Sequence, residues 1–95
     1  LNDPAALGAI AALQNAGRMP GGTMVYGVDG VPESRELIRT GWMTATAVQS
    51  PRGIGRMAAE EAYRILSGES AADIDLPTRL LTRANMNEND DGGWD

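Results

Sequence analysis

The chain contains no cysteine, no histidine and no phenylalanine among its 95 residues. Without cysteine, disulfides and thiolate metal sites are excluded, and the redox compartment stays open. Without histidine, the chain lacks the usual acid–base residue at neutral pH and the commonest metal ligand. No Gly-x-Ser-x-Gly motif and no nucleophile–base pair is visible either. We therefore expect no enzyme, no metal and no cofactor.

Aromatic residues are also scarce, at 4% of a chain that is 42% hydrophobic. The apolar residues are mostly alanine, leucine, isoleucine, valine and methionine, so large core side chains are few. A chain of this length forms at most one small domain with a thin stability margin. It opens on Leu1 and not on a methionine. We expect a piece of a longer protein, whose core is incomplete without the rest.

Positive charge and long apolar runs are lacking too. The formal net charge is −5 and no run of lysines occurs, which argues against duplex nucleic acid as a partner, because such binding depends on lysine and arginine meeting phosphate. No apolar stretch approaches about 18 residues, so no segment is predicted to span a bilayer, and no signal peptide is visible. The last eight residues hold four acids and no base: Glu88, Asp90, Asp91 and Asp95. We expect residues 86–95 to be a flexible acidic tail.

What is present is an alternation of helical and strand-like segments. Helices are predicted over 2–17, 32–41 and 51–68, and strand-like runs over 23–28, 42–49 and 74–83. Asn2 or Asp3 can cap the first helix, Ser50 can cap the third, and Gly41 ends the second. This order predicts an α/β fold with a parallel sheet layered by helices. Pro77 places the last strand at an edge.

Apolar residues at helical spacing predict which sides of the helices are buried. In the first helix the stripe consists of Leu7, Ile10, Ala11 and Leu13. In the third helix the buried side is expected to comprise Ile54, Met57, Ala58, Ala62, Ile65 and Leu66.

Polar side chains stand where three strands end. Ligands of parallel α/β sheets bind outside the carboxyl ends of the strands. Asp29 follows one strand, Gln49 follows the next, and Asn2 precedes the first helix, where a strand missing from this chain would end. Carboxylate and amide groups exchange several hydrogen bonds with hydroxyls, as a polyhydroxylated ligand such as a sugar requires. Each residue also has a local alternative: a helix cap for Asn2, a turn for Asp29 and a solvated surface for Gln49.

Four stretches resemble one family in its order and spacing: "NDPAALGAIAALQNAG", "VYGVDGVPES", "LIRTGWMTATAVQSPRGIGRMAAEEAYRILSGE" and "IDLPTRLLTRAN". They are similar to the C-terminal third of type I periplasmic sugar-binding proteins, the ribose-binding-like solute receptors of ABC transporters. The resemblance covers residues 1 to about 85. It implies a periplasmic-binding-protein-like fold of two α/β lobes that close on a sugar. The whole protein would be periplasmic, or extracellular and membrane-anchored, and would deliver the sugar to a membrane permease.

The resemblance also assigns parts and residues. It implies that residues 1–49 belong to the C-terminal lobe, 50–72 to the N-terminal lobe and 73–85 to a strand that crosses back, with hinges near 49–51 and 73–77. The family's sugar-contacting asparagine, aspartate and glutamine match Asn2, Asp29 and Gln49. The family's stacking aromatic rings and clamping arginines come mostly from regions outside this chain. The chain alone is therefore expected to bind sugar weakly or not at all, and the remaining N-terminal part of the protein is its partner.

Three alternatives stay open. Gly53, Gly55 and Ala58 match a dinucleotide-binding pattern, but they lie inside the predicted helix, where close packing also explains them. Residues 87–92 match the first half of a calcium loop without its closing glutamate. The serious rival is the ligand-sensing domain of a LacI-type repressor, which shares the fold, although "VDG" and "ATAV" favour the transport receptor. Trp42 begins a strand and is expected at the surface or in the core, not in the sugar site.

Overall fold

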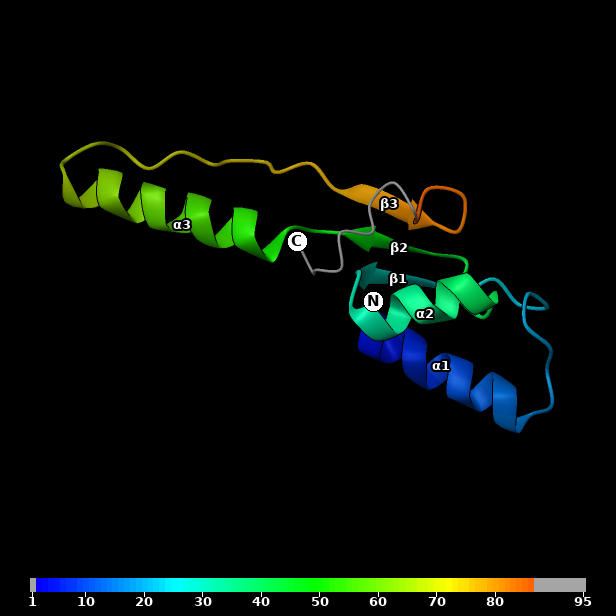
Figure 1. Ribbon diagram of the computed structural model, residues 1–95. Helices are drawn as coiled ribbons and strands as arrows, with labels where there is room; N and C mark the ends of the chain where they lie inside the picture. The colour runs from blue at the N-terminus through cyan, green and yellow to red at the C-terminus, as the bar shows by residue number, and fades with distance from the viewer. Residues whose placement is uncertain (1, 87–95) are drawn as a thin grey trace.

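The computed structural model describes residues 2–86 as three helices and three strands that alternate along the chain (Figure 1). They are α1 (Asp3–Asn15), β1 (Tyr26–Asp29), α2 (Pro32–Thr40), β2 (Ala45–Val48), α3 (Pro51–Leu66) and β3 (Arg79–Thr82). The strands form one sheet in the order β1–β2–β3. The predicted α/β fold class is confirmed, and β3 lies at an edge of this sheet, as Pro77 indicated.

The sheet is mixed in direction. β1 and β2 are parallel, with Tyr26 opposite Ala45 and Asp29 opposite Val48. β3 runs antiparallel to β2, so the expectation of a parallel sheet is wrong for this strand. The path of the chain explains the difference: α3 leads away from the sheet, and the extended segment 69–78 returns and re-enters the sheet in the reverse direction (Figure 1). We call residues 69–78 the returning segment.

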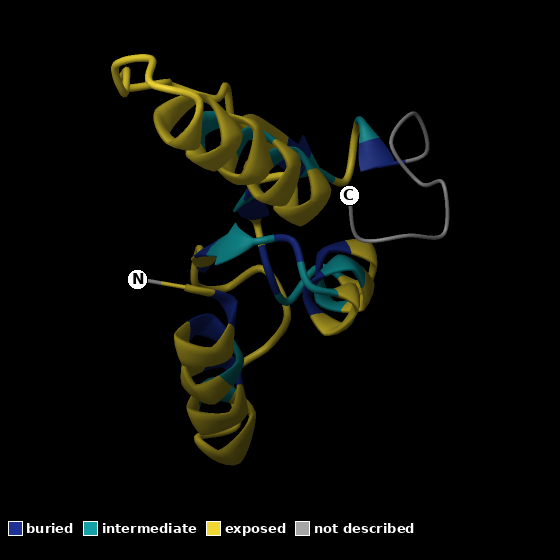
Figure 2. Ribbon diagram, turned by 90° about the vertical axis from the view of Figure 1, so that its left-hand side faces the viewer, coloured by how far each residue is buried: buried dark blue, intermediate teal, exposed yellow. Residues whose placement is uncertain are grey.

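The molecule is elongated, with extents of 59 × 25 × 16 Å. α1 and α2 pack beside the strands, whereas α3 and the returning segment project away from them (Figure 1). Among the described residues, burial concentrates in the sheet, in its flanking loops and on the inner sides of α1 and α2 (Figure 2). The core comprises Ala6, Ile10, Val25, Ile38, Met43, Val48, Leu81 and Met86. Met86, the first residue of the predicted tail, thus packs in the core, and residues 87–95 lie outside the described part.

The start of α1 follows directly from its sequence. Asn2 has extended backbone angles, and its Oδ1 accepts a hydrogen bond from the Ala5 amide at 3.0 Å. Pro4 fits the first turn, because the backbone N–H that proline lacks would have no helical partner there. Of the two predicted capping residues, the structure therefore selects Asn2.

The buried side of α1 differs from the predicted stripe. Asp3, Ala6 and Ile10 are buried, at spacings of three and four residues that place them on one face of a helix. Of the predicted stripe, Ile10 is buried and the two leucines are partly buried, but Ala11 is exposed. The packed face is rotated because it begins at Asp3, which bonds to the sheet.

α3 is an amphipathic helix in which no residue is buried. Ser50 caps it as predicted, since its Oγ accepts a hydrogen bond from the Gly53 amide at 3.0 Å. The side predicted to be buried is open within residues 2–86: Ile54, Ile65 and Leu66 are 43%, 51% and 87% exposed. That prediction is wrong for the described part of the chain, where only the returning segment lies beside the helix (Figure 1).

One buried carboxylate connects α1 to the sheet. Asp3 is 0% exposed. Its Oδ2 accepts hydrogen bonds from the amides of Gly30 and Val31, each at 2.8 Å, and its Oδ1 accepts one from the Thr46 hydroxyl at 2.7 Å. A buried charge destabilises a fold unless hydrogen bonds replace its hydration. The three bonds meet this need and link α1 to the β1–α2 turn and to β2.

Gly27 leaves room for that carboxylate. A Cβ added at Gly27 would collide with Asp3 Oδ1, and it would also lie 3.4 Å from Thr46 Oγ1. Its backbone does not require glycine, because its φ is not positive. The requirement for glycine therefore comes from the close approach of a side chain.

We expect Gly27→Ala to lower the free energy of unfolding of the whole protein by about 1–3 kcal/mol, because the added methyl group displaces Asp3 from its hydrogen bonds. Gly8→Ala is the matched control. Gly8 lies in α1, and a Cβ there would meet nothing within 4 Å, so alanine should stabilise the helix by about 0.5–1 kcal/mol. Urea denaturation measures both variants. Equal stabilities would contradict the close approach at Gly27.

Candidate functional site

The carboxyl ends of β1 and β2 coincide at one edge of the sheet. Asp29 is the last residue of β1 and lies opposite Val48, the last residue of β2. Gln49 follows Val48 directly. The parallel register therefore places Asp29 and Gln49 at the same edge, where ligands of such sheets bind.

Asn2 comes to the same edge through its neighbour Asp3. The Asp3 carboxylate accepts the N–H of Gly30, which directly follows Asp29. The structure thus brings together the chain segments that carry all three predicted site residues, and Asp3 is the group that joins them. The sequence offered one signal for this role: Asp3 shares a helical face with Ala6 and Ile10, and a carboxylate on a buried face needs partners.

Asn2 and Gln49 are both exposed. Asn2 uses its side-chain oxygen to cap α1, which leaves the amide NH₂ as the group able to donate to a ligand. Gln49 carries an amide that can donate and accept. The local role foreseen for Asn2, a helix cap, is therefore real, and it occupies only one of the two polar atoms of the side chain.

Asp29 has an unusual backbone. Its φ is 125°, and within residues 2–86 it is the one residue other than glycine whose φ is positive. A side chain with a Cβ is disfavoured in this region, and a residue held there stores on the order of 1–3 kcal/mol of strain. Asp29 is half-buried. Such strain persists only where the surroundings impose it, and it is typical of functional positions.

Gly30 continues the same turn and is held on three sides. Its φ is 79°, and a Cβ there would lie 2.9 Å from Val48 Cγ2. Its N–H donates to Asp3 Oδ2 at 2.8 Å, and its carbonyl oxygen accepts from Arg35 Nε at 3.3 Å. The turn that carries Asp29 is therefore fixed against α1, β2 and α2.

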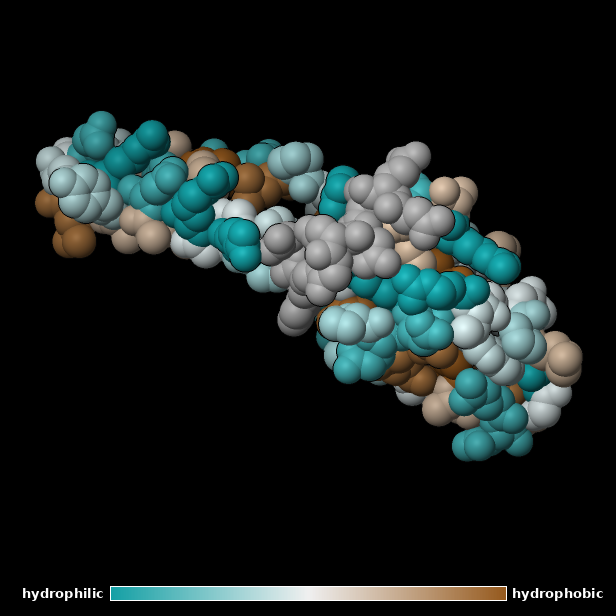
Figure 3. Space-filling model, viewed as in Figure 1, coloured by the Kyte–Doolittle hydropathy of each residue, from teal (hydrophilic) through white to brown (hydrophobic). Residues whose placement is uncertain are grey.

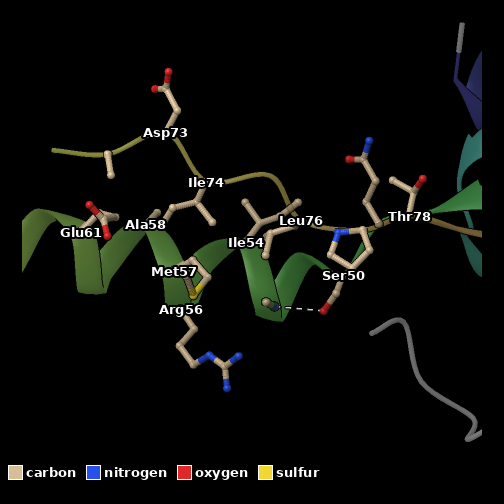
Figure 4. Close-up of a pocket in the computed structure, with 14 residues that line it drawn as sticks. Ser50, Ile54, Arg56, Met57, Ala58, Glu61, Asp73, Ile74, Leu76 and Thr78 are labelled. Carbon is tan, nitrogen blue, oxygen red and sulfur yellow. Dashed lines mark hydrogen bonds between the residues drawn. The ribbon is translucent and has the colours of Figure 1, made fainter.

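An open groove lies between α3 and the returning segment. Ile54 of α3 lies close to Ile74 and Leu76 of the segment (Figure 4). Apolar surface is visible between the helix and the segment in Figure 3. Gln49 also lines this groove, so the predicted site edge borders an apolar surface. The sequence did not predict the groove, because the pattern of α3 indicated a covered face.

The remaining sequence motifs form no site within residues 2–86. Gly53 and Gly55 lie inside α3, as expected. A Cβ at Gly55 would meet nothing within 4 Å, so close packing does not explain that glycine in the described part.

The described residues contain no cluster of potential metal ligands. None of their helices has the length and apolar character needed to span a membrane. The predicted calcium half-loop at 87–92 lies outside the described residues. Trp42 is half-buried against the core, as expected.

The site edge therefore offers one carboxylate and two amide side chains. A carboxylate accepts hydrogen bonds, and amides both donate and accept them. A ligand rich in hydroxyl groups matches this set, because each hydroxyl also donates and accepts.

A family model described as a periplasmic binding protein domain matches residues 1–70 of the chain. Among curated proteins, the D-allose-binding periplasmic protein of Escherichia coli is 35% identical over 86 residues, which cover 84% of this chain and 27% of that protein. The ribose import binding protein of Salmonella typhimurium is 43% identical over 68 residues, which cover 72% of this chain and 22% of that protein. The chain thus spans less than a third of the length of these curated relatives.

Solved structures show the same similarity. The myo-inositol binding protein of Caulobacter, bound to myo-inositol, matches with a TM-score of 0.83 and 36% identity, over 93% of this chain and 30% of that one. An ABC transporter periplasmic solute binding protein from Actinobacillus succinogenes, with bound D-allose, matches with a TM-score of 0.81 and 27% identity, over 92% of this chain and 30% of that one.

Asp29→Gly should have a free energy of unfolding about 1–2 kcal/mol greater than Asp29→Ala, because both variants lose the carboxylate and only glycine adopts such a φ without strain. Urea denaturation of the whole protein measures this difference. The matched control is the same pair of substitutions at Asp75, an exposed residue of the returning segment whose φ is not positive. There alanine should equal or exceed glycine. If the alanine variant at position 29 were also at least as stable as the glycine variant, the backbone strain at Asp29 would be contradicted.

Proposed function

Since the chain belongs to the periplasmic binding protein family, we propose that the protein containing it is the substrate-binding component of an ABC transporter. It binds a monosaccharide or a similar polyhydroxylated solute between two lobes and delivers that solute to a membrane permease. The whole protein is periplasmic, or extracellular and anchored to the membrane. Its function is binding and not catalysis.

The observation that carries this proposal is the arrangement of Asn2, Asp29 and Gln49 at one edge of the sheet. The register of β1 and β2 brings Asp29 and Gln49 to that edge, and the hydrogen bond from the Gly30 amide to Asp3 brings Asn2 there. The relatives support the ligand class, because they include proteins named for ribose and D-allose and a structure bound to myo-inositol. Their transport names also favour a transport receptor over a LacI-type repressor.

The three side chains have complementary roles in the proposed site. Asp29 accepts hydrogen bonds from hydroxyls of the solute, and Gln49 donates and accepts them. Asn2 donates through its amide NH₂, because its oxygen caps α1. Closure of the lobes removes these groups from water. In the closed site, any polar group that found no hydrogen-bond partner on the solute would lower the affinity.

The proposed division between the lobes falls at the end of β2. Residues 1–49 form part of the C-terminal lobe, which agrees with the core that α1, α2 and the strands share. Residues 50–72 belong to the N-terminal lobe, so that the remaining N-terminal part of the protein covers the apolar face of α3. Residues 73–85 cross back, in agreement with the pairing of β3 with β2. The hinges lie near 49–51 and 73–77.

Asp29→Ala in the whole protein should weaken solute binding about 10- to 150-fold, because loss of hydrogen bonds to a charged acceptor costs about 1.5–3 kcal/mol. Calorimetry with D-ribose, D-allose and myo-inositol measures this loss on the solute that the unchanged protein binds best. Glu69→Ala is the matched control, since Glu69 is an exposed acid beyond α3, and it should leave the affinity unchanged. Equal affinities of the two variants would remove Asp29 from the site.

Ile54→Ser should lower the free energy of unfolding of the whole protein by about 1–3 kcal/mol, because the N-terminal lobe covers this side chain. In the described residues alone Ile54 is 43% exposed, so a smaller loss is expected if nothing covers it. Glu60→Gln is the matched control, because Glu60 is an exposed residue of α3 off the apolar face. If Ile54→Ser were as stable as Glu60→Gln in urea, the proposed place of α3 in the N-terminal lobe would be wrong.

A further inference from the structure

We infer that Asp3 is a positioning residue of the solute site. Its buried carboxylate holds the turn after β1, so that Asp29 keeps the strained backbone from which its side chain meets the solute. This role rests on the proposed function, because it concerns the same edge of the sheet. Asp3 is 0% exposed, so it acts through its neighbours and not by touching the solute.

One carboxylate oxygen fixes two successive peptide groups. Asp3 Oδ2 accepts the N–H groups of Gly30 and Val31, each at 2.8 Å. The Gly30 N–H belongs to the peptide group that joins Asp29 to Gly30, so this bond fixes the chain directly after Asp29. On the other side, Asp29 is held in register opposite Val48. With both sides fixed, Asp29 cannot relax from its φ of 125°.

The other carboxylate oxygen reaches the second strand. Asp3 Oδ1 accepts the Thr46 hydroxyl at 2.7 Å, and Thr46 lies in β2, which ends directly before Gln49. Asn2 is adjacent to Asp3 in the chain and caps α1. This second bond anchors the Asp3 carboxylate to β2, whereas its two bonds to the turn are the ones that fix the backbone after Asp29.

A purely structural role for Asp3 predicts different behaviour. If Asp3 only stabilises the fold, its loss lowers stability, and any effect on affinity is the same whatever residue stands at position 29. If Asp3 positions Asp29, its loss weakens binding only while the Asp29 carboxylate is present. Thr46→Val is the matched control, because it removes the bond to β2 and leaves both bonds to the turn in place.

The test is a double-mutant cycle in the whole protein, by calorimetry with whichever of D-ribose, D-allose and myo-inositol the unchanged protein binds best. Asp3→Ala should weaken binding about tenfold or more, but less than about threefold in the Asp29→Ala background. Asp3→Asn should restore the affinity to within about threefold, because its oxygen can accept both turn N–H groups and its NH₂ can donate to the Thr46 hydroxyl. Thr46→Val should lower the urea midpoint and leave the affinity within about threefold.

Equal losses of affinity in the two backgrounds, or an unchanged affinity in Asp3→Ala, would overturn the inference. If Asp3→Ala does not fold, Asp3→Ser takes its place in the same cycle and is held to the same criteria. The hydroxyl of serine is too short to replace the carboxylate in its bonds to the turn.

A second measurement needs no solute. In the presence of Asp3, the urea midpoint of Asp29→Gly should exceed that of Asp29→Ala. In the Asp3→Ala background this difference should vanish, because the released turn relaxes. If none of the three solutes binds and the difference vanishes, the proposed function fails while the hold of Asp3 on the turn stands. If the difference between the two urea midpoints persists in the Asp3→Ala background, the hold of Asp3 on the turn is overturned, whether or not a solute binds.

Discussion

The arrangement of this chain depends on the burial of one charge. The Asp3 carboxylate is removed from water, and it is tolerated there only because hydrogen bonds replace its hydration. That requirement determines its surroundings: two consecutive N–H groups in the turn after β1, a hydroxyl at Thr46 and no side chain at Gly27. The charge also stands in the first turn of α1, where the helix dipole favours an anion. By satisfying one carboxylate, the fold fixes a helix, a turn and a strand relative to one another.

The same edge of the sheet carries a second feature that does not favour folding. Glycine suits a φ of 125° better than any other residue, yet aspartate occupies position 29. Folding alone therefore does not explain the residue, whereas the proposed role of its carboxylate in solute binding does. Under the proposed function, a group that is held in place before the solute arrives loses little freedom on binding, so a rigid, strained turn favours affinity even though it weakens the fold.

Local signals in the sequence predicted the local features well. Asn2 and Ser50 cap helices, and Gly41 ends α2 with a φ of 90°. Features that depend on distant parts of the chain were missed. The direction of β3 depends on where the returning segment re-enters the sheet, and the face of α3 is open because no other element of the described residues packs on it. The hydrogen bonds of Asp3 to the turn and to β2 were not predicted, because an aspartate directly before Pro4 is also a common helix cap. The site residues were predicted from strand ends, and they stay a prediction until a solute is measured.

The composition and the site have a common explanation under the proposed function. The chain is poor in aromatic residues, and no residue of its 16-residue amphipathic helix α3 is buried in the described part. Burial stops after Val48 and resumes only at Leu81, and the open helix α3 begins at Pro51, so Gln49 stands where the open part of the chain begins. Under the proposed function, a solute that bonds to both Asp29 and Gln49 therefore links the fixed turn after β1 to the start of the proposed hinge. Under the proposed function, binding energy at that point acts on the hinge itself and thereby favours the closed arrangement of the lobes.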